Sequence, residues 1–122
     1  MLIRDIADCR YERVIDQTIL CELLHPDKVP GAAGLSCSIA HAIVPAGEAS
    51  LPHLLETSVE LYYILSGSGE MHIDGEHAPV RPGQIVLIPP KARQFIRNTG
   101  SVDLVFLCIV APKWQAGDER LA

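Results

Sequence analysis

The stretch that decides the fold runs from residue 47 to residue 67 and reads GEASLPHLLETSVELYYILSG. In an extended strand, residues two apart share a face, so Glu60, Tyr62 and Ile64 point the same way. An isolated carboxylate on such an apolar face is costly to keep ionised, unless a cation or hydrogen-bond donors accompany it. The stretch therefore predicts a strand that carries one functional carboxylate, Glu60, toward an interior.

Strand signals are dense along the rest of the chain. Nine glycines and nine prolines separate short runs rich in Val, Ile, Leu and Tyr, which is typical of an all-β domain. Asp74-Gly75 suits a type I′ hairpin turn, and Pro82-Gly83 suits a type II turn. We predict strands over 18–23, 35–44, 60–65, 70–73, 84–88, 93–98 and 104–110. Many short strands with frequent turns indicate a β-sandwich or a barrel.

Composition restricts the class of protein. The chain has 122 residues, 48% of them hydrophobic, which suits one folded domain with a real core. It carries a net charge of −5 and has no basic run, so no nucleic-acid surface is expected. No apolar run reaches the roughly 20 residues of a membrane span. Charged residues interrupt the N-terminus early, unlike a signal peptide, and we expect a cytoplasmic protein.

The four cysteines are scattered, at positions 9, 21, 37 and 108, and form no Cys-x-x-Cys motif. A zinc ribbon or a thioredoxin-like motif is therefore excluded. In a cytoplasmic chain we expect these cysteines to be buried small hydrophobic residues rather than disulfides.

A second stretch, residues 83–98, reads GQIVLIPPKARQFIRN. Together the two stretches resemble the two sequence motifs of the cupin family. The residues that match in place are Gly47, His53, Glu60 and Gly67 in the first motif, and Gly83, Pro89 and Asn98 in the second. The resemblance implies an all-β cupin jelly-roll barrel, also called a double-stranded β-helix. It implies a single domain over residues 1–122, with the motif core at 36–112, a short N-terminal segment at 1–17, and a polar tail at 113–122 that docks loosely or frays.

The chain departs from both motifs at metal-binding positions. A typical cupin metal has three His ligands and one Glu, but here the second His of the first motif is Leu55 and the His of the second motif is Gln94. The resemblance implies that His53, Glu60 and Gln94 bind a divalent metal ion such as Zn, Fe, Mn or Ni. A neutral amide oxygen from Gln94 would suit harder cations better than softer ones.

His41 is the candidate replacement for the lost metal ligand. The strand over 37–43 alternates a bulky series, which includes Ile39, His41 and Ile43, with a small one. We expect the bulky series to face the interior, which would place His41 near the metal. The alternative is a buried His bonded to the backbone. His25, His72 and His77 are expected in solvent.

The leading hypothesis for function is a metal-dependent enzyme that acts on a small polar metabolite. The substrate would be sugar-like or keto-acid-like, and the reaction that of an isomerase, a lyase or a dioxygenase. The metal would act as a Lewis acid, and Glu60 would serve as the catalytic base if the metal is absent. The alternative is a non-catalytic module that binds or senses a small molecule. The resemblance is closest to short stand-alone cupins labelled mannose-6-phosphate-isomerase-like.

The predicted strand over 104–110 is apolar on both of its faces. A strand of a lone barrel needs only one apolar face, so a second buried surface is expected. We therefore predict a homodimer.

Overall fold

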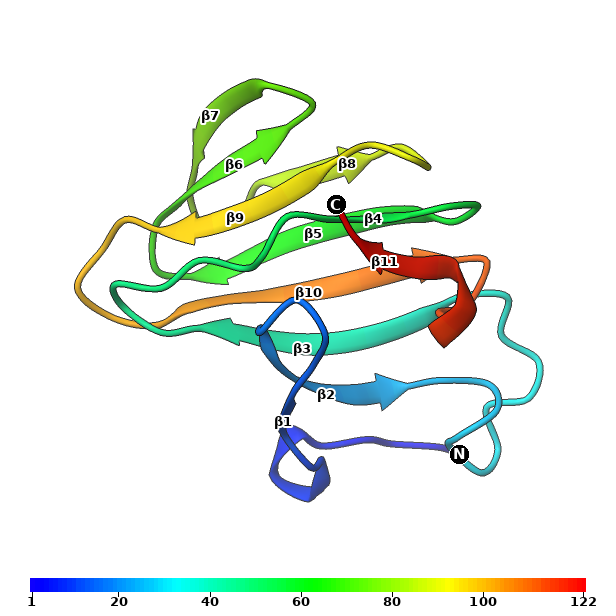
Figure 1. Cartoon of the computed structure of the whole chain (residues 1–122). Helices are drawn as coiled ribbons and strands as arrows, with labels where there is room; N and C mark the ends of the chain where they lie inside the picture. Colours follow the sequence, from blue (N-terminus) through cyan, green and yellow to red (C-terminus); the bar gives the residue numbers. More distant parts are fainter.

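The computed structural model describes all 122 residues as two antiparallel sheets that form one jelly-roll barrel (Figure 1). The larger sheet contains, in spatial order, β1 (Glu12–Arg13), β2 (Ile19–Leu24), β3 (Ser38–Val44), β10 (Leu104–Ala111), β5 (Val59–Ser66) and β8 (Ile85–Ile88). The smaller sheet contains β11 (Glu119–Leu121), β4 (His53–Leu55), β9 (Gln94–Asn98), β6 (Gly69–Ile73) and β7 (Glu76–Val80). Two short 3-10 helices, η1 (Ile6–Asp8) and η2 (Ala116–Asp118), complete the chain. The predicted all-β jelly-roll barrel is confirmed.

Backbone angles at two places show why the chain turns where it does. Asp74 and Gly75, between β6 and β7, have φ angles of 49° and 87°, as a type I′ turn requires. Gly67 follows β5 with a φ of 84°, and a Cβ there would collide with the backbone carbonyl of Asp103. Only glycine therefore fits position 67.

The inner face of the larger sheet packs against the smaller sheet and forms the core. Along β10, Leu104, Phe106, Cys108 and Val110 are buried, and their neighbours are only partly buried. The aromatic rings of Phe106 and Tyr62, from adjacent strands, lie 4.5 Å apart between their centroids. Strands β3, β10 and β5 therefore form the floor of the barrel interior (Figure 1).

The expectation about the two faces of β3 is wrong. Ser38, Ala40, Ala42 and Val44 face the interior, whereas His41 and the bulky residues beside it face outward. Ala42 pairs with Phe106 on β10, and both are completely buried. The inner positions of β3 are small because aromatic side chains from neighbouring strands already fill that space.

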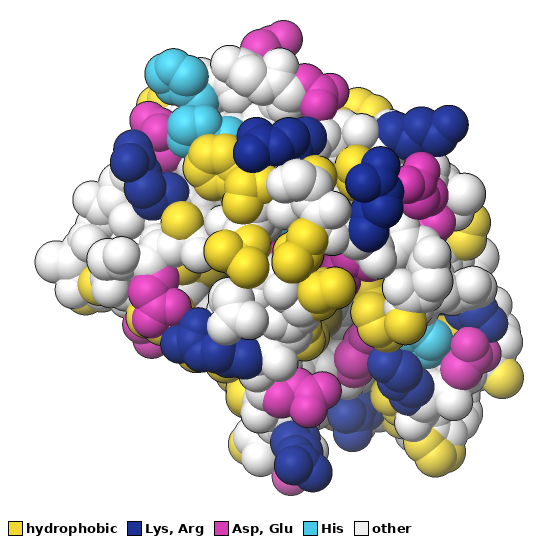
Figure 2. All heavy atoms as spheres, in the orientation of Figure 1, with side chains coloured by type: hydrophobic (Ala, Val, Ile, Leu, Met, Phe, Trp, Pro, Cys, Tyr) yellow, Lys and Arg dark blue, Asp and Glu magenta, His cyan; other side chains and the backbone are white.

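The outer face of the larger sheet is also rich in apolar side chains. Ile85 and Leu87 on β8 are 59% and 62% exposed, and Tyr63 and Leu65 on β5 are 38% and 40% exposed. Elsewhere on the surface, acidic and basic side chains are interspersed on the face drawn in Figure 2. The outer face is therefore a second apolar surface, which a monomer leaves in contact with water.

The sequence prediction missed four short strands, β1, β4, β7 and β11. The C-terminal tail is ordered rather than frayed. Its last strand, β11, pairs with β4, with Leu121 opposite His53. The preceding turn is fixed by Asp118, whose carboxylate accepts bonds from the backbone N–H of Thr57 and of Ser58. None of the helical segments has the length and hydrophobicity of a membrane span.

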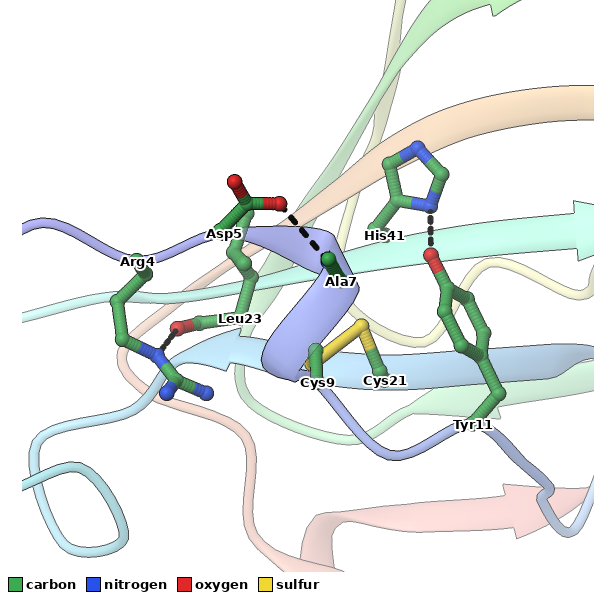
Figure 3. The surroundings of a disulfide bond; sticks show 8 residues. All are labelled: Arg4, Asp5, Ala7, Cys9, Tyr11, Cys21, Leu23 and His41. Atoms are coloured by element: carbon green, nitrogen blue, oxygen red, sulfur yellow. Dashed lines mark hydrogen bonds between the residues drawn. A yellow bond between two sulfur atoms is a disulfide. The ribbon is translucent and has the colours of Figure 1, made fainter.

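Cys9 and Cys21 form a disulfide, so the expectation that all four cysteines are free is wrong for this pair (Figure 3). Asp5 caps η1 by accepting a bond from the backbone N–H of Ala7 at 2.8 Å. This turn returns the chain to β2, where the Cα atoms of the two cysteines lie 5.8 Å apart, within disulfide range. Cys37 and Cys108 are free thiols.

Candidate functional site

A cavity of about 90 Å³ opens into the barrel between the two sheets. Its floor is formed by inward side chains of β2, β3, β5 and β10, and the N-terminal segment and the C-terminal tail provide further walls. The acidic and basic side chains that line it are Glu12, Asp16, Glu22, Glu60, Glu119, Lys28 and His53. The cavity is therefore strongly acidic, with one lysine as its only permanent cation.

Glu60 points inward from β5 and is only 6% exposed. The amide Nε2 of Gln94, a fully buried residue of β9, donates a hydrogen bond to its Oε1 at 2.7 Å. Burial raises the pKa of Glu60 to about 7, although the charge of His53 and the bond from Gln94 partly oppose this. Near neutral pH, both protonation states of Glu60 are therefore populated, which suits a group that exchanges protons.

His53 lies on β4 and is 1% exposed. Its Nδ1 donates to the backbone carbonyl of Leu51 at 2.8 Å, because a carbonyl can only accept. The other ring nitrogen, Nε2, lies 3.4 Å from the carboxylate Oδ2 of Asp16. The ring is therefore fixed from both sides, and a protonated Nε2 would face a counter-charge.

Asp16 is a site residue that the sequence prediction missed. It is 5% exposed, and its Oδ1 accepts a bond from the backbone N–H of Thr18 at 3.0 Å. Its backbone carbonyl accepts from the N–H of Leu51, the residue that also anchors His53. Asp16 lies outside both cupin motifs, and its only local signal is the spacing to Thr18, which permits an Asx turn.

Tyr62 and Glu119 also line the cavity. Burial raises the pKa of the Tyr62 hydroxyl well above its ordinary value, and the neighbouring Glu60 charge raises it further. Tyr62 therefore stays protonated as a donor. Burial likewise raises the pKa of Glu119. The sequence prediction missed this residue because the C-terminal tail was expected to dock loosely or to fray.

The structure does not bring the four predicted metal ligands together. His41 lies on the outer face of β3, where its Nδ1 is hydrogen-bonded to the hydroxyl of Tyr11 at 2.6 Å. Gln94 is not part of the cavity wall; its Nε2 is turned to Glu60, and its Oε1 has no hydrogen-bond partner. No three His, Cys, Asp or Glu side chains converge as a metal-holding group. The residues therefore do not fit the expected shell, and only His53 and Glu60 share the cavity.

The other histidines lie outside the cavity. The expectation of a solvated His25 is wrong: it is 2% exposed, donates from Nε2 to the carbonyl of Trp114, and accepts from the N–H of Asp27. His72 is half-buried, with its ring stacked on Phe95 at 4.2 Å. His77 is exposed, as predicted.

Comparison with known proteins places the chain in a family. The family model described as Cupin domain matches residues 40–110. An uncharacterized protein of Methanocaldococcus jannaschii is 42% identical over 126 residues, which cover 99% of this chain and 98% of that protein. The chain is thus similar along its whole length to another small protein.

Two solved structures have the same fold. The first, a predicted oxalate decarboxylase of Thermotoga maritima, superposes with a TM-score of 0.80 at 24% identity, over 91% of this chain and 99% of that one. The second, a Streptomyces nucleoside dehydratase variant with uridine, superposes with a TM-score of 0.78 at 17% identity, over 100% of this chain and 91% of that one. The family match, the barrel and the in-place motif residues agree: this chain is a member of the cupin family.

Proposed function

We propose that this cupin binds a small neutral metabolite bearing hydroxyl groups, and that Glu60 and His53 catalyse proton transfer on it. The observation that carries the proposal is the state of Glu60, a buried carboxyl with a pKa of about 7 in the same cavity as His53. Isomerases and lyases both depend on such proton transfers, which makes them the favoured reaction classes.

The charge of the cavity supports a neutral ligand. Five carboxylates and one lysine line it, so an anion such as oxalate would meet net repulsion. A sugar-like or nucleoside-like compound would bring no charge, and its hydroxyls could bond to carboxylates and to Tyr62. The sugar-like substrate is therefore favoured over the keto-acid-like one, and the chemistry is closer to that of a nucleoside dehydratase than to that of an oxalate decarboxylase.

Glu60 and His53 have different roles in a proton transfer at the carbon next to a substrate carbonyl. Glu60, when ionised, accepts a proton from carbon. Protonated His53 donates from Nε2 to the substrate oxygen on which negative charge develops. Asp16, 3.4 Å from that nitrogen, stabilises the charged ring before transfer. Gln94 holds the Glu60 carboxylate in place through its 2.7 Å hydrogen bond.

The experiment is deuterium exchange in D₂O, followed by loss of proton NMR signal. Dihydroxyacetone serves as a neutral hydroxyketone probe and pyruvate as an anionic one. We expect the protein to accelerate exchange of dihydroxyacetone and not of pyruvate, and expect Glu60→Gln and His53→Ala each to lower the rate by roughly 100-fold or more. Glu76→Gln, at an exposed carboxylate outside the cavity, is the matched control.

An absence of exchange in every neutral probe tried would remove the acid–base proposal. If those probes still raise the melting temperature, the chain is a binding module instead. A divalent metal on His53 and Glu60 is the remaining alternative, and metal content per chain, measured by mass spectrometry after loading and dialysis, decides it. A stoichiometric metal that His53→Ala removes would support it.

A further inference from the structure

The N-terminal strap, which we define as residues 1–18, forms one wall of the cavity. Its contributions to the lining are Glu12, Val14, Asp16 and Thr18. Asp16 is the strap residue that faces His53 directly. Any movement of the strap away from the barrel therefore opens the cavity and separates Asp16 from His53.

Noncovalent contacts hold the outer part of the strap weakly. None of residues 1–15 is buried, so this part is not anchored by a hydrophobic core. Strand β1 has two residues and pairs only with β2, at the edge of the sheet. Three side-chain contacts with the barrel add to this: Arg4 Nε donates to the carbonyl of Leu23 at 2.9 Å, Tyr11 bonds to His41 (Figure 3), and Arg13 Nη1 donates to the carboxylate of Glu48 at 2.9 Å on the surface. Such a segment is expected to open at low free-energy cost.

The disulfide joins the strap to the strand that it covers. Cys21 lies on β2 between Leu20 and Glu22, both of which line the cavity. Cys9 lies at the end of η1, just before the cavity-lining part of the strap. The Cys21 side chain points to the opposite, outer face of β2, where Cys21 lies opposite His41. The bridge therefore closes, on the outer side of the sheet, the loop from residue 9 to residue 21 that carries the cavity-lining part of the strap.

The two sulfurs differ in how accessible they are. Cys21 is 1% exposed. Cys9 is partly exposed and lies in a surface groove beside Arg4 and Arg10. An external thiolate would therefore reach Cys9 first.

We propose that the Cys9–Cys21 disulfide is a redox latch that controls access to the cavity. A dithiol reductant opens it: one thiolate attacks Cys9 Sγ, the sulfur–sulfur bond breaks, and Cys21 leaves as a thiolate that takes up a proton. The second thiol of the reductant then displaces Cys9, which is also protonated. The reductant ends as a disulfide, and the protein gains two electrons and two protons. The latch rests on the proposed function only for its effect on substrate, because closure of the cavity can be tested without catalysis.

The chain contains its own probe, since the free thiol of Cys108 lines the cavity. The experiment measures alkylation of Cys108 by iodoacetamide with mass spectrometry, in a Cys37→Ser background that removes the other free thiol. We expect Cys9→Ser/Cys21→Ser to accelerate Cys108 alkylation at least about tenfold relative to the oxidised parent. Addition of a dithiol to the parent should do the same, and re-oxidation should restore the slow rate.

Equal alkylation rates in the oxidised parent, the reduced parent and the double variant would overturn the latch. Hydrogen exchange keeps this result interpretable if the double variant folds poorly. In the reduced parent, protection should fall at the backbone N–H of Val14, which bonds to Thr18 within the strap, while that of Phe106 on β10 stays protected. Loss of protection at both sites would mean general unfolding and would also overturn the latch. A working latch without dihydroxyacetone exchange would leave the latch intact and refute only the proposed reaction.

Discussion

The two faces of the larger sheet have similar composition and different environments. Along β10, Phe106 faces the interior and is completely buried, whereas Leu107 faces outward and is only partly buried. Along β5, Tyr62 lines the cavity and its neighbour Tyr63 is 38% exposed. Hydrophobicity alone therefore does not tell which face of this sheet is the inside. What distinguishes the inner face is its packing and the few polar groups that it buries.

The largest expected effect comes from the packed part of the inner face. Phe106→Ala should lower the free energy of unfolding by about 3–5 kcal/mol, because it leaves a cavity beside Tyr62. Leu87→Ala is the control on the outer face, where the side chain is 62% exposed. Measured by urea denaturation at a concentration that keeps the chain monomeric, it should cost under about 0.5 kcal/mol. Equal losses would erase the distinction between the faces.

The polar part of the inner face should make stability depend on pH. The pKa of Glu60 rises from an ordinary 4.5 to about 7 on folding, so the folded state binds the proton more tightly. Its contribution is complete below about pH 4.5 and is lost as the pH rises through 7, a change of roughly 3 kcal/mol. Urea denaturation between pH 4.5 and 8 should show this decline in the parent and a much smaller one in Glu60→Gln, which keeps the contribution of Glu119, a carboxyl whose pKa burial also raises.

Glu70, on the surface, is the control for this pH dependence. Its hydrogen bond from His72 holds the pKa of the carboxyl below its ordinary value, so its contribution is lost as the pH falls. Glu70→Gln should therefore leave the decline above pH 4.5 unchanged. A flat profile in the parent over this range would contradict the buried, protonatable Glu60.

The difference between the inner and outer faces of the larger sheet also explains which features the sequence alone could predict. The motif glycines, the two turns and the central strands were predictable because they depend on backbone conformation and on local alternation. The orientation of His41 was not, since both faces of β3 carry apolar side chains and only the bulk of Phe106 decides which is inside. Asp16 and Glu119 reach the cavity from outside the motif core, through contacts between distant segments that no local pattern records.

The outer face should bind a second copy of the chain. We expect light scattering to report a dimer at micromolar concentration, because Ile85, Leu87 and their neighbours form an apolar surface. Ile85→Lys/Leu87→Lys should weaken the dimer at least about 100-fold by placing charges in the interface. Val102→Lys, at an equally exposed apolar residue in a loop, should leave the dimer intact. A monomeric parent would refute the homodimer.

The smallest expected effect is at His41, and it separates the two faces most directly. The His41 side chain is on the outer face of β3, away from the cavity. Partial burial there lowers its pKa. His41→Ala removes its hydrogen bond with Tyr11, which should cost about 1 kcal/mol of stability. It should change neither the zinc content after loading and dialysis nor the rate of deuterium exchange. His53→Ala, at the histidine on the inner side, should abolish the exchange at a comparable loss of stability. If His41→Ala instead lowered the rate of deuterium exchange as His53→Ala is expected to do, the ring would have to reach the cavity, and the assignment of the faces of β3 would be wrong.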